Sequence, residues 1–193
     1  MNREEFITNI REHQPDLLAE TYLAADTVTA FPNPVDYASF KTRVHQQLAG
    51  VESLSIVGTG NWRFSLNPDK GLKEFDRTSD IDIAVVSSEQ FNQTWEELRR
   101  VHRSRWYTLP HAIREKIRRN AEDVYAGFIT PMWIPGDPCE LRYRFKTILN
   151  QLRDASVQFK PIKMLFFKNE VEAIDYYKRG FLLAKKKVER DEI

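Results

Sequence analysis

GTGNWRFSLNPDKGLKEFDRTSDIDIAVV, residues 58–86, is the stretch of sequence that decides the fold. The apolar run Leu54–Val57 leads into its glycine turn, a polar loop follows, and a second apolar run begins at Ile81. Short apolar runs bounded by turn residues are typical of buried β-strands. We therefore expect two strands here, within an α/β (α+β) fold.

Two carboxylates, Asp80 and Asp82, stand at the entrance of the second run and alternate with Ile81 and Ile83. Residues i and i+2 lie on one face of a strand, so we expect the acids on one face and the isoleucines in the core. Aspartate is depleted in strands, and two like charges repel, so a cation should offset them. Mg²⁺ is the simplest such cation, because it binds carboxylate oxygens together with substrate phosphates. The alternative is a solvated strand edge that carries two unrelated acids.

The glycine turn is the second candidate feature, since Gly58 and Gly60 flank Thr59 directly after a strand. Glycine lets the backbone approach a ligand closely, and successive N–H groups in such a turn form a concave anion site. Asn61 and Arg63 follow as candidate phosphate contacts. Taken alone, the turn is equally typical of an ordinary connection between a strand and a helix.

Three other phosphate-binding motifs do not fit this stretch. A P-loop needs Lys-Ser or Lys-Thr after its second glycine, and none follows Gly60. A dinucleotide fingerprint needs a third glycine where Arg63 stands, and its acid belongs at the far end of the second strand. A kinase glycine loop needs a lysine strand and a catalytic loop, and neither is visible.

The remaining pattern of strand, Gly-Thr turn, spacer and D-x-D resembles the nucleotidyltransferase superfamily, which includes DNA polymerase β and the minimal nucleotidyltransferases. In that family a Gly-Ser turn holds a triphosphate and the D-x-D pair holds two metal ions. The resemblance covers residues 51–88. It implies a mixed sheet with flanking helices, a nucleotide-binding turn at Gly58-Thr59, and Mg²⁺ or Mn²⁺ on catalytic Asp80 and Asp82.

The sequence departs from that family at three points. Thr59 replaces the serine, the spacer to Asp80 is longer, and no third acid stands on a later strand. The natural strand for such an acid, Val157–Phe167, carries lysine and glutamine at its polar positions. Three acids that precede it are Asp123, Glu140 and Asp154. The third carboxylate stays unassigned, and without one the protein would bind a nucleotide without turning it over.

Length and composition predict one domain. With 193 residues, 41% hydrophobic, the chain can bury a core, which we divide into a helical extension (1–50), a sheet core with the active site (51–168) and a terminal helix (169–193). The formal net charge of +1 gives no information about which partners the protein binds. A single cysteine, Cys139, excludes an intrachain disulfide. We expect a cytoplasmic protein with no membrane partner, because no apolar run approaches the ~20 residues of a membrane helix.

Apolar periodicity and capping residues predict the other elements. The expected helices cover 3–29, 36–50, 88–105, 140–153 and 169 onward. The expected strands cover 52–57, 80–86, the front half of 123–138 and, interrupted by Pro161, 157–167.

A local basic stretch lies between Arg99 and Arg119. Eight cationic side chains are opposed there by Glu115 alone, with Trp106 and Tyr107 between them. Cations beside aromatic rings suit a nucleic-acid backbone with stacked bases, and equally suit a nucleoside triphosphate. A solvated helix face is the alternative. The cations are Arg99, Arg100, Arg103, Arg105, Arg114, Lys116, Arg118 and Arg119.

The resemblance implies a metal-dependent nucleotidyltransferase that moves a nucleotidyl group from an NTP or dNTP to a hydroxyl of a nucleic acid, protein or nucleotide. Two alternatives stay open. One is a catalytically silent nucleotide- or RNA-binding module on the same fold, and the other is a regulatory, antidote-type protein with a protein partner.

Overall fold

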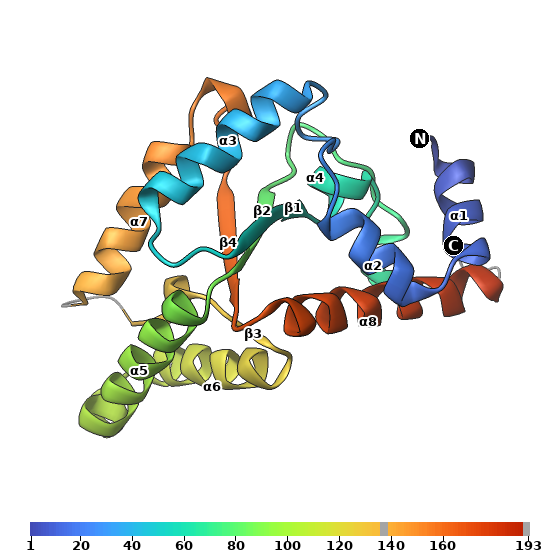
Figure 1. The fold of residues 1–193 in the computed structure, drawn as a ribbon. Helices are drawn as coiled ribbons and strands as arrows, with labels where there is room; N and C mark the ends of the chain where they lie inside the picture. Colours follow the sequence, from blue (N-terminus) through green and yellow to red (C-terminus); the bar gives the residue numbers. More distant parts are fainter. Residues whose placement is uncertain (136–138, 191–193) are drawn as a thin grey trace.

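The structure is a computed structural model that describes residues 1–135 and 139–190, and it confirms the α/β class (Figure 1). A mixed sheet lies at the centre in the order β1-β2-β4-β3. Strand β1 (Ser53–Val57) runs antiparallel to β2 (Ile81–Val86), which runs parallel to β4 (Ile162–Phe167). The two-residue β3 (Phe128–Ile129) pairs antiparallel with β4.

One face of the sheet is covered by α3 (Pro34–Gln47), α5 (Ser88–Arg105), α6 (His111–Tyr125) and α7 (Glu140–Leu152). Alternate strand residues point to this side because the period of a strand is two. The buried strand residues of this face are Leu54, Ile56, Ile81, Ile83, Val85, Met164 and Phe166. In Figure 1, α3 and α7 lie together on one side of the strands, while α5 and α6 extend from the other end of β2.

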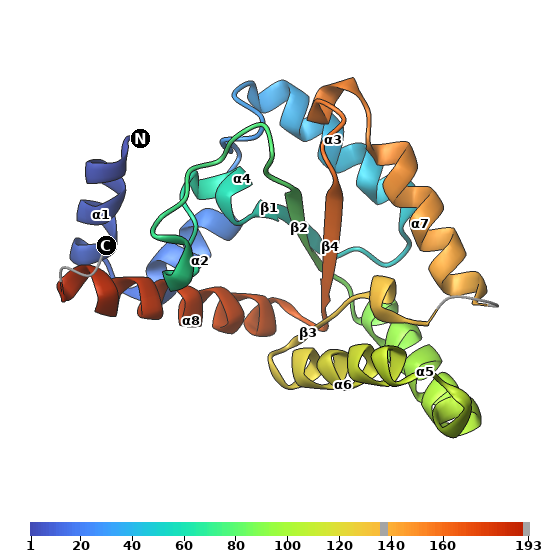
Figure 2. The ribbon, with the colours of Figure 1, turned by 180° about the vertical axis from the view of Figure 1, so that it is seen from behind.

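The opposite face carries the N-terminal and C-terminal helices. Helices α1 (Arg3–Glu12), α2 (Pro15–Leu23) and α8 (Glu170–Glu189) pack there with Val57, Ala84, Val86 and Phe167. Seen from behind, α8 runs below α1 and α2 (Figure 2). The two ends of the chain thus build one layer over the face on which the expected site lies.

The prediction of one helix over 3–29 is wrong, because α1 ends at Glu12 and α2 begins at Pro15. Proline lacks the N–H needed within a helix and disfavours helical backbone in the residue before it, so it begins a helix instead of continuing one. Helix α3 also begins earlier than predicted. Its N-cap is Asn33, whose side chain accepts a hydrogen bond from the Val35 amide at 2.9 Å, and not Asp36.

Two predicted strands are shorter in the structure. Helix α6 continues to Tyr125, which leaves only β3 for the strand expected in 123–138, and 136–138 lie outside the described residues. In the expected strand 157–167, Gln158 and Phe159 have positive φ angles of 53° and 55°, so β4 begins only after Pro161. Pro161 lacks the amide that a ladder needs. None of the described helices is long and apolar enough to span a membrane.

Candidate functional site

The end of β1 brings the main chain close to a carboxylate of β2. Gly58 has φ 65° and ψ −151°, a backbone conformation that is essentially restricted to glycine. A Cβ atom on Gly58 would lie 3.4 Å from Oδ2 of Asp82, an ordinary van der Waals distance, so the backbone conformation and not a lack of space favours glycine here. The turn and the D-x-D pair therefore lie side by side, although 22 residues separate Gly60 from Asp82.

Asp80 and Asp82 share one side of the sheet. Ile81 and Ile83 are fully buried against α3 and α7, whereas both acids line a cleft on the α8 side. In the ladder, Asp82 lies opposite Val57 of β1 and opposite Lys163 of β4. The prediction from strand alternation is confirmed.

The cleft has a volume of about 670 Å³. Strand ends and the loop 65–79 supply its charged lining: Lys70, Lys73, Glu74, Asp80, Asp82 and Lys163. Helix α8 supplies an opposite lining of Tyr176, Tyr177, Arg179, Gly180 and Leu183. Leu66 also lines the cleft and lies so close to α8 that a Cβ on Gly180 would approach its Cδ1 to 3.3 Å. Charged and aromatic groups thus face one cavity.

Lys163 occupies the position beside the two carboxylates. Its Nζ forms an ion pair with Oδ2 of Asp80, and its charge favours the ionised form of Asp82. Burial is the larger effect on Asp82 and raises its pKa above the ordinary value, with a further rise from the charge of Asp80. Lys70 acts in the opposite direction, and its side chain has no ion-pair partner within the described residues.

The turn at 76–79 positions Asp80 at the entrance of β2. Asp76 accepts hydrogen bonds from the Thr78 amide at 2.8 Å, the Thr78 hydroxyl at 2.7 Å and the Ser79 hydroxyl at 3.1 Å. These bonds hold the pKa of Asp76 well below its usual range. The buried Lys160 donates to the Asp76 carbonyl at 2.6 Å and ties this turn to the entrance of β4.

Two predicted phosphate contacts lie elsewhere. The buried Asn61 side chain donates to the carbonyls of Tyr22 at 2.7 Å and Ile56 at 2.8 Å, so it fastens α2 to β1. Arg63 lies outside the cleft lining and donates a hydrogen bond to Glu74 at 2.6 Å. Gly60 is buried, and a Cβ there would meet Ile56 at 3.1 Å, which indicates a packing role. Of the predicted turn, Gly58 and Thr59 line the cleft.

None of the three acids considered for a third carboxylate lines the cleft. Asp154 pairs with Arg43, and Glu140 begins α7. Asp123 lies on α6, where burial raises its pKa to about 6. Glu74 does line the cleft, but its carboxylate is paired with Arg63.

Asp80 and Asp82 suit one divalent ion. Mg²⁺ usually keeps several waters and takes one or two carboxylates plus substrate phosphates, so this pair is a sufficient protein contribution. Across residues 1–135 and 139–190, no group of three or more His, Cys, Asp or Glu side chains is placed to hold a metal. A second ion would need a further ligand, and Lys163 stands at the neighbouring position.

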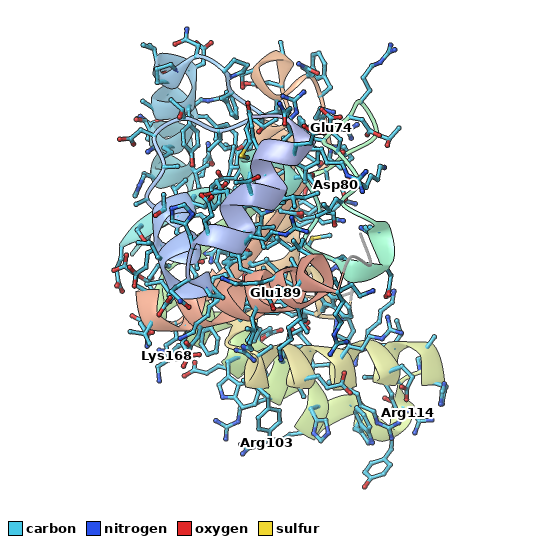
Figure 3. The ribbon with its side chains drawn as sticks, turned by 90° about the vertical axis from the view of Figure 1, so that its right-hand side faces the viewer. Glu74, Asp80, Arg103, Arg114, Lys168 and Glu189 are labelled. Atoms are coloured by element: carbon cyan, nitrogen blue, oxygen red, sulfur yellow. The ribbon has the colours of Figure 1, made fainter. Side chains whose placement is uncertain are left out.

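The basic stretch forms a helical hairpin of α5 and α6 (Figure 3). Arg114 and Arg118 lie over the ring of Trp106, with 6.0 and 5.7 Å to its centroid, and Arg99 lies over Trp95. Tyr107 at the tip is 93% exposed. Arg103 and Arg114 lie at one end of the molecule and Asp80 towards the other, so the hairpin is not part of the cleft. Ion pairs of Arg100 with Glu97 and of Arg118 with Glu115 neutralise part of its charge.

The two regions are joined through the end of α6. Arg179 of α8 donates to the carbonyl of Ala126 at 3.0 Å, and both residues line the cleft. Helix α6 thus leads from the tip of the hairpin to the rim of the cleft.

Comparisons with family models, curated proteins and solved structures return no match for this chain. The geometry of the cleft is therefore the feature that indicates what this chain could bind.

Two residues of the cleft, Tyr176 and Arg179, have no pattern in the sequence that marks them. Tyr177 is predicted as part of an apolar helix stripe, which resembles any packing face, and Lys70 is predicted either to reach a phosphate or to belong to a solvated loop face. The sequence predicts Lys163 as a polar position in a strand, but it does not predict the ion pair with Asp80. The only signal for it was the alternation of β4, which places Lys163 on the face opposite to that of Met164.

Proposed function

We propose that this protein transfers a nucleotidyl group from a nucleoside triphosphate to a hydroxyl acceptor. The observation that carries the proposal is the convergence of the Gly58 turn, Asp80 and Asp82 in one cleft of about 670 Å³. A nucleoside triphosphate has a highly charged end and a flat, largely apolar end. The cleft offers cations and carboxylates to the first and an aromatic wall to the second.

The phosphates would lie against Gly58 and Thr59, with Lys70 as a nearby cation that has no ion-pair partner within the described residues. The Gly58 conformation opens the backbone to a ligand, and a lysine acts as a point charge on phosphate. The base would lie on the α8 wall of Tyr176 and Leu183. Aromatic faces bind bases by stacking with little preference for sequence.

Asp80 and Asp82 would hold Mg²⁺. When bound, the ion supplies neutralisation of charge on the phosphates and lowers the pKa of an acceptor hydroxyl. The protein itself contributes position, because phosphoryl-transfer catalysis is mostly orientation and electrostatic stabilisation. Strand β2 and the turn at Asp76 hold the two carboxylates in place, and Asp82 lies against Gly58.

The α5–α6 hairpin supports a nucleic acid as the acceptor. Its cations and partly exposed rings match a phosphate backbone with stacked bases, and α6 leads to the cleft. Reversing Arg99 and Arg103 to glutamate is expected to weaken binding of a labelled single-stranded RNA at least tenfold and to flatten its salt dependence. Lys168→Glu, an exposed lysine after β4, is the matched control. Unchanged RNA binding in the hairpin variant would remove this acceptor.

The test of the reaction is pyrophosphate release. The protein is incubated with each labelled NTP and dNTP plus Mg²⁺ or Mn²⁺, and products are resolved as polymer, dinucleotide, cyclic nucleotide or labelled protein. Asp80→Ala should abolish product, whereas Asp69→Ala, an exposed acid of the same loop, should leave it unchanged. Identical product from wild type and Asp80→Ala rules out the proposed reaction.

A silent nucleotide-binding protein is the second candidate, and Lys163 is the observation that favours it. A lysine beside the carboxylates offsets their charge without a metal ion. This candidate predicts that a nucleotide raises the melting temperature while no combination of nucleotide and metal releases pyrophosphate.

A further inference from the structure

We propose that the cleft takes one divalent ion with its nucleotide, and that the Nζ of Lys163 supplies the second positive charge to the phosphates. The inference rests on the proposed nucleotide ligand, although not on turnover. It assigns Lys163 the role of a binding residue within the cleft.

The sheet places this lysine beside the acids. Strands β2 and β4 are parallel neighbours in which Asp82 pairs with Lys163, so the two side chains leave the same face of the sheet. The ion pair of its Nζ with Oδ2 of Asp80 already places a positive charge beside a carboxylate that a second ion would need.

Charge and ligand number oppose a second ion here. Two ions about 3.5–4 Å apart need carboxylates that bridge or flank them. The third acid that lines the cleft, Glu74, lies in an isolated bridge with Phe64 and not on β2 or β4, and the neighbouring strand presents a cation. A second divalent ion beside Asp80 and Asp82 would meet the ammonium of Lys163, and the sheet offers it no third carboxylate among the described residues that line the cleft.

The exposure of the pair allows an exchange of partners. The side chain of Lys163 is 64% exposed and that of Asp80 is 30% exposed. An exposed ion pair contributes little stability, so the lysine can leave Asp80 at small cost. Asp80 is then open to one metal ion, and the ammonium, still at the rim of the cleft, can reach a phosphate oxygen. A purely structural ion pair would instead keep both partners together when a nucleotide binds.

The experiment counts metal ions on the whole protein in the presence of a saturating analogue of ATP or GTP that cannot be cleaved between its α- and β-phosphates. Bound Mn²⁺ is measured by electron paramagnetic resonance, and nucleotide affinity by calorimetry. Wild type is expected to bind one protein-dependent Mn²⁺ per chain, after subtraction of nucleotide alone. Lys163→Asp, which adds a carboxylate, is expected to bind two Mn²⁺ ions. Lys163→Gln is expected to bind one Mn²⁺ ion, with its nucleotide affinity lowered by up to about tenfold.

Controls separate this role from an effect on folding. Lys168→Gln changes an exposed lysine that follows β4 and should leave both the ion count and the affinity unchanged. Circular dichroism must show folded variants, and if Lys163→Asp does not fold, wild type and Lys163→Gln decide the result.

Two ions on wild type, or wild-type nucleotide affinity in Lys163→Gln, would overturn the inference. One bound ion on wild type and a lowered nucleotide affinity in Lys163→Gln would support the inference. If wild type then released no pyrophosphate, the proposed reaction would be overturned and the inference would not. Absence of nucleotide binding to wild type would overturn both.

Discussion

Two aspartates only six residues apart, Asp76 and Asp82, experience opposite environments. Asp76 lies in an exposed turn where three hydrogen bonds favour its ionised form and lower its pKa. Asp82 lies at the start of a central strand, where burial and the charge of Asp80 raise its pKa, and Lys163 offsets only part of this. The carboxylate of Asp76 is satisfied by hydrogen bonds of its own loop, whereas that of Asp82 accepts no hydrogen bond from the residues that the structure describes.

This difference separates a structural acid from a functional one. A group whose charged form is disfavoured by its surroundings, and which faces a cleft, is a candidate for ligand binding. Asp76 fixes the turn that places Asp80, while Asp80 and Asp82 offer negative charge to the cleft. The comparison can be tested by changing the two acids in parallel.

The largest expected difference concerns turnover. Asp82→Asn removes a proposed metal ligand and should lower the rate of pyrophosphate release by about 100-fold or more. Asp76→Asn keeps an oxygen that accepts hydrogen bonds and should change the rate only a few-fold. Rates are compared under saturating nucleotide and Mg²⁺, and equal losses in the two variants would break the distinction.

The second prediction concerns the turn that faces Asp82. Gly58→Ala forces a side chain into a backbone conformation that costs about 1–3 kcal/mol, and it should weaken nucleotide binding as well. Gly71→Ala is the matched control, because Gly71 also has a positive φ, of 53°, but has nothing within 4 Å of an added Cβ. Gly71→Ala should lower the free energy of unfolding without affecting nucleotide affinity.

The third prediction concerns stability against pH. The folded pKa of Asp82 lies above the unfolded value of 3.8, so its ionisation lowers stability as the pH rises through that window. Asp82→Asn should therefore raise the melting temperature at pH 7. The folded pKa of Asp76 lies below 3.8, so its contribution is present at pH 7 and is lost as the pH falls below that value. Asp76→Asn should therefore lower the melting temperature at pH 7. Thermal melts of both variants from pH 3 to 8 check this, and a change of melting temperature in the same direction in both variants would contradict it.

The smallest expected effect comes from Asp123, whose pKa is raised like that of Asp82 but which does not line the cleft. Its buried Oδ2 has no hydrogen-bond partner within the described residues, and burial raises its pKa to about 6. Stability should fall as the pH rises from 3.8 towards 6, because the unfolded chain releases this proton first. Asp123→Asn should be slightly more stable than wild type at pH 8, with unchanged nucleotide affinity. A changed nucleotide affinity in Asp123→Asn would show that Asp123 also affects binding, so that lining the cleft does not separate the role of Asp82 from that of Asp123.

The features that sequence predicted are those with a local cause. Alternation in β2 sufficed to place Asp80 and Asp82 on one face, since the period of a strand fixes it. The pairing of Asp82 with Lys163 depends on the register of two strands separated by α5, α6 and α7, and no local pattern specifies it. The wall from α8 likewise depends on tertiary packing.

Local rules also explain the errors. Apolar spacing alone predicts one helix over 3–29, but Pro15 ends that continuity and begins α2. The position of Asn61 in the turn predicts a phosphate contact, whereas its side chain joins β1 to α2 through two hydrogen bonds.

The most direct test of the account is an anomalous-difference map of crystals grown with Mn²⁺ and a non-hydrolysable nucleoside triphosphate. The account predicts a single manganese peak coordinated by Asp80 and Asp82, with phosphate density against Gly58 and the base against α8. Manganese and nucleotide density at another surface, with the ion pair of Asp80 and Lys163 unchanged, would contradict it.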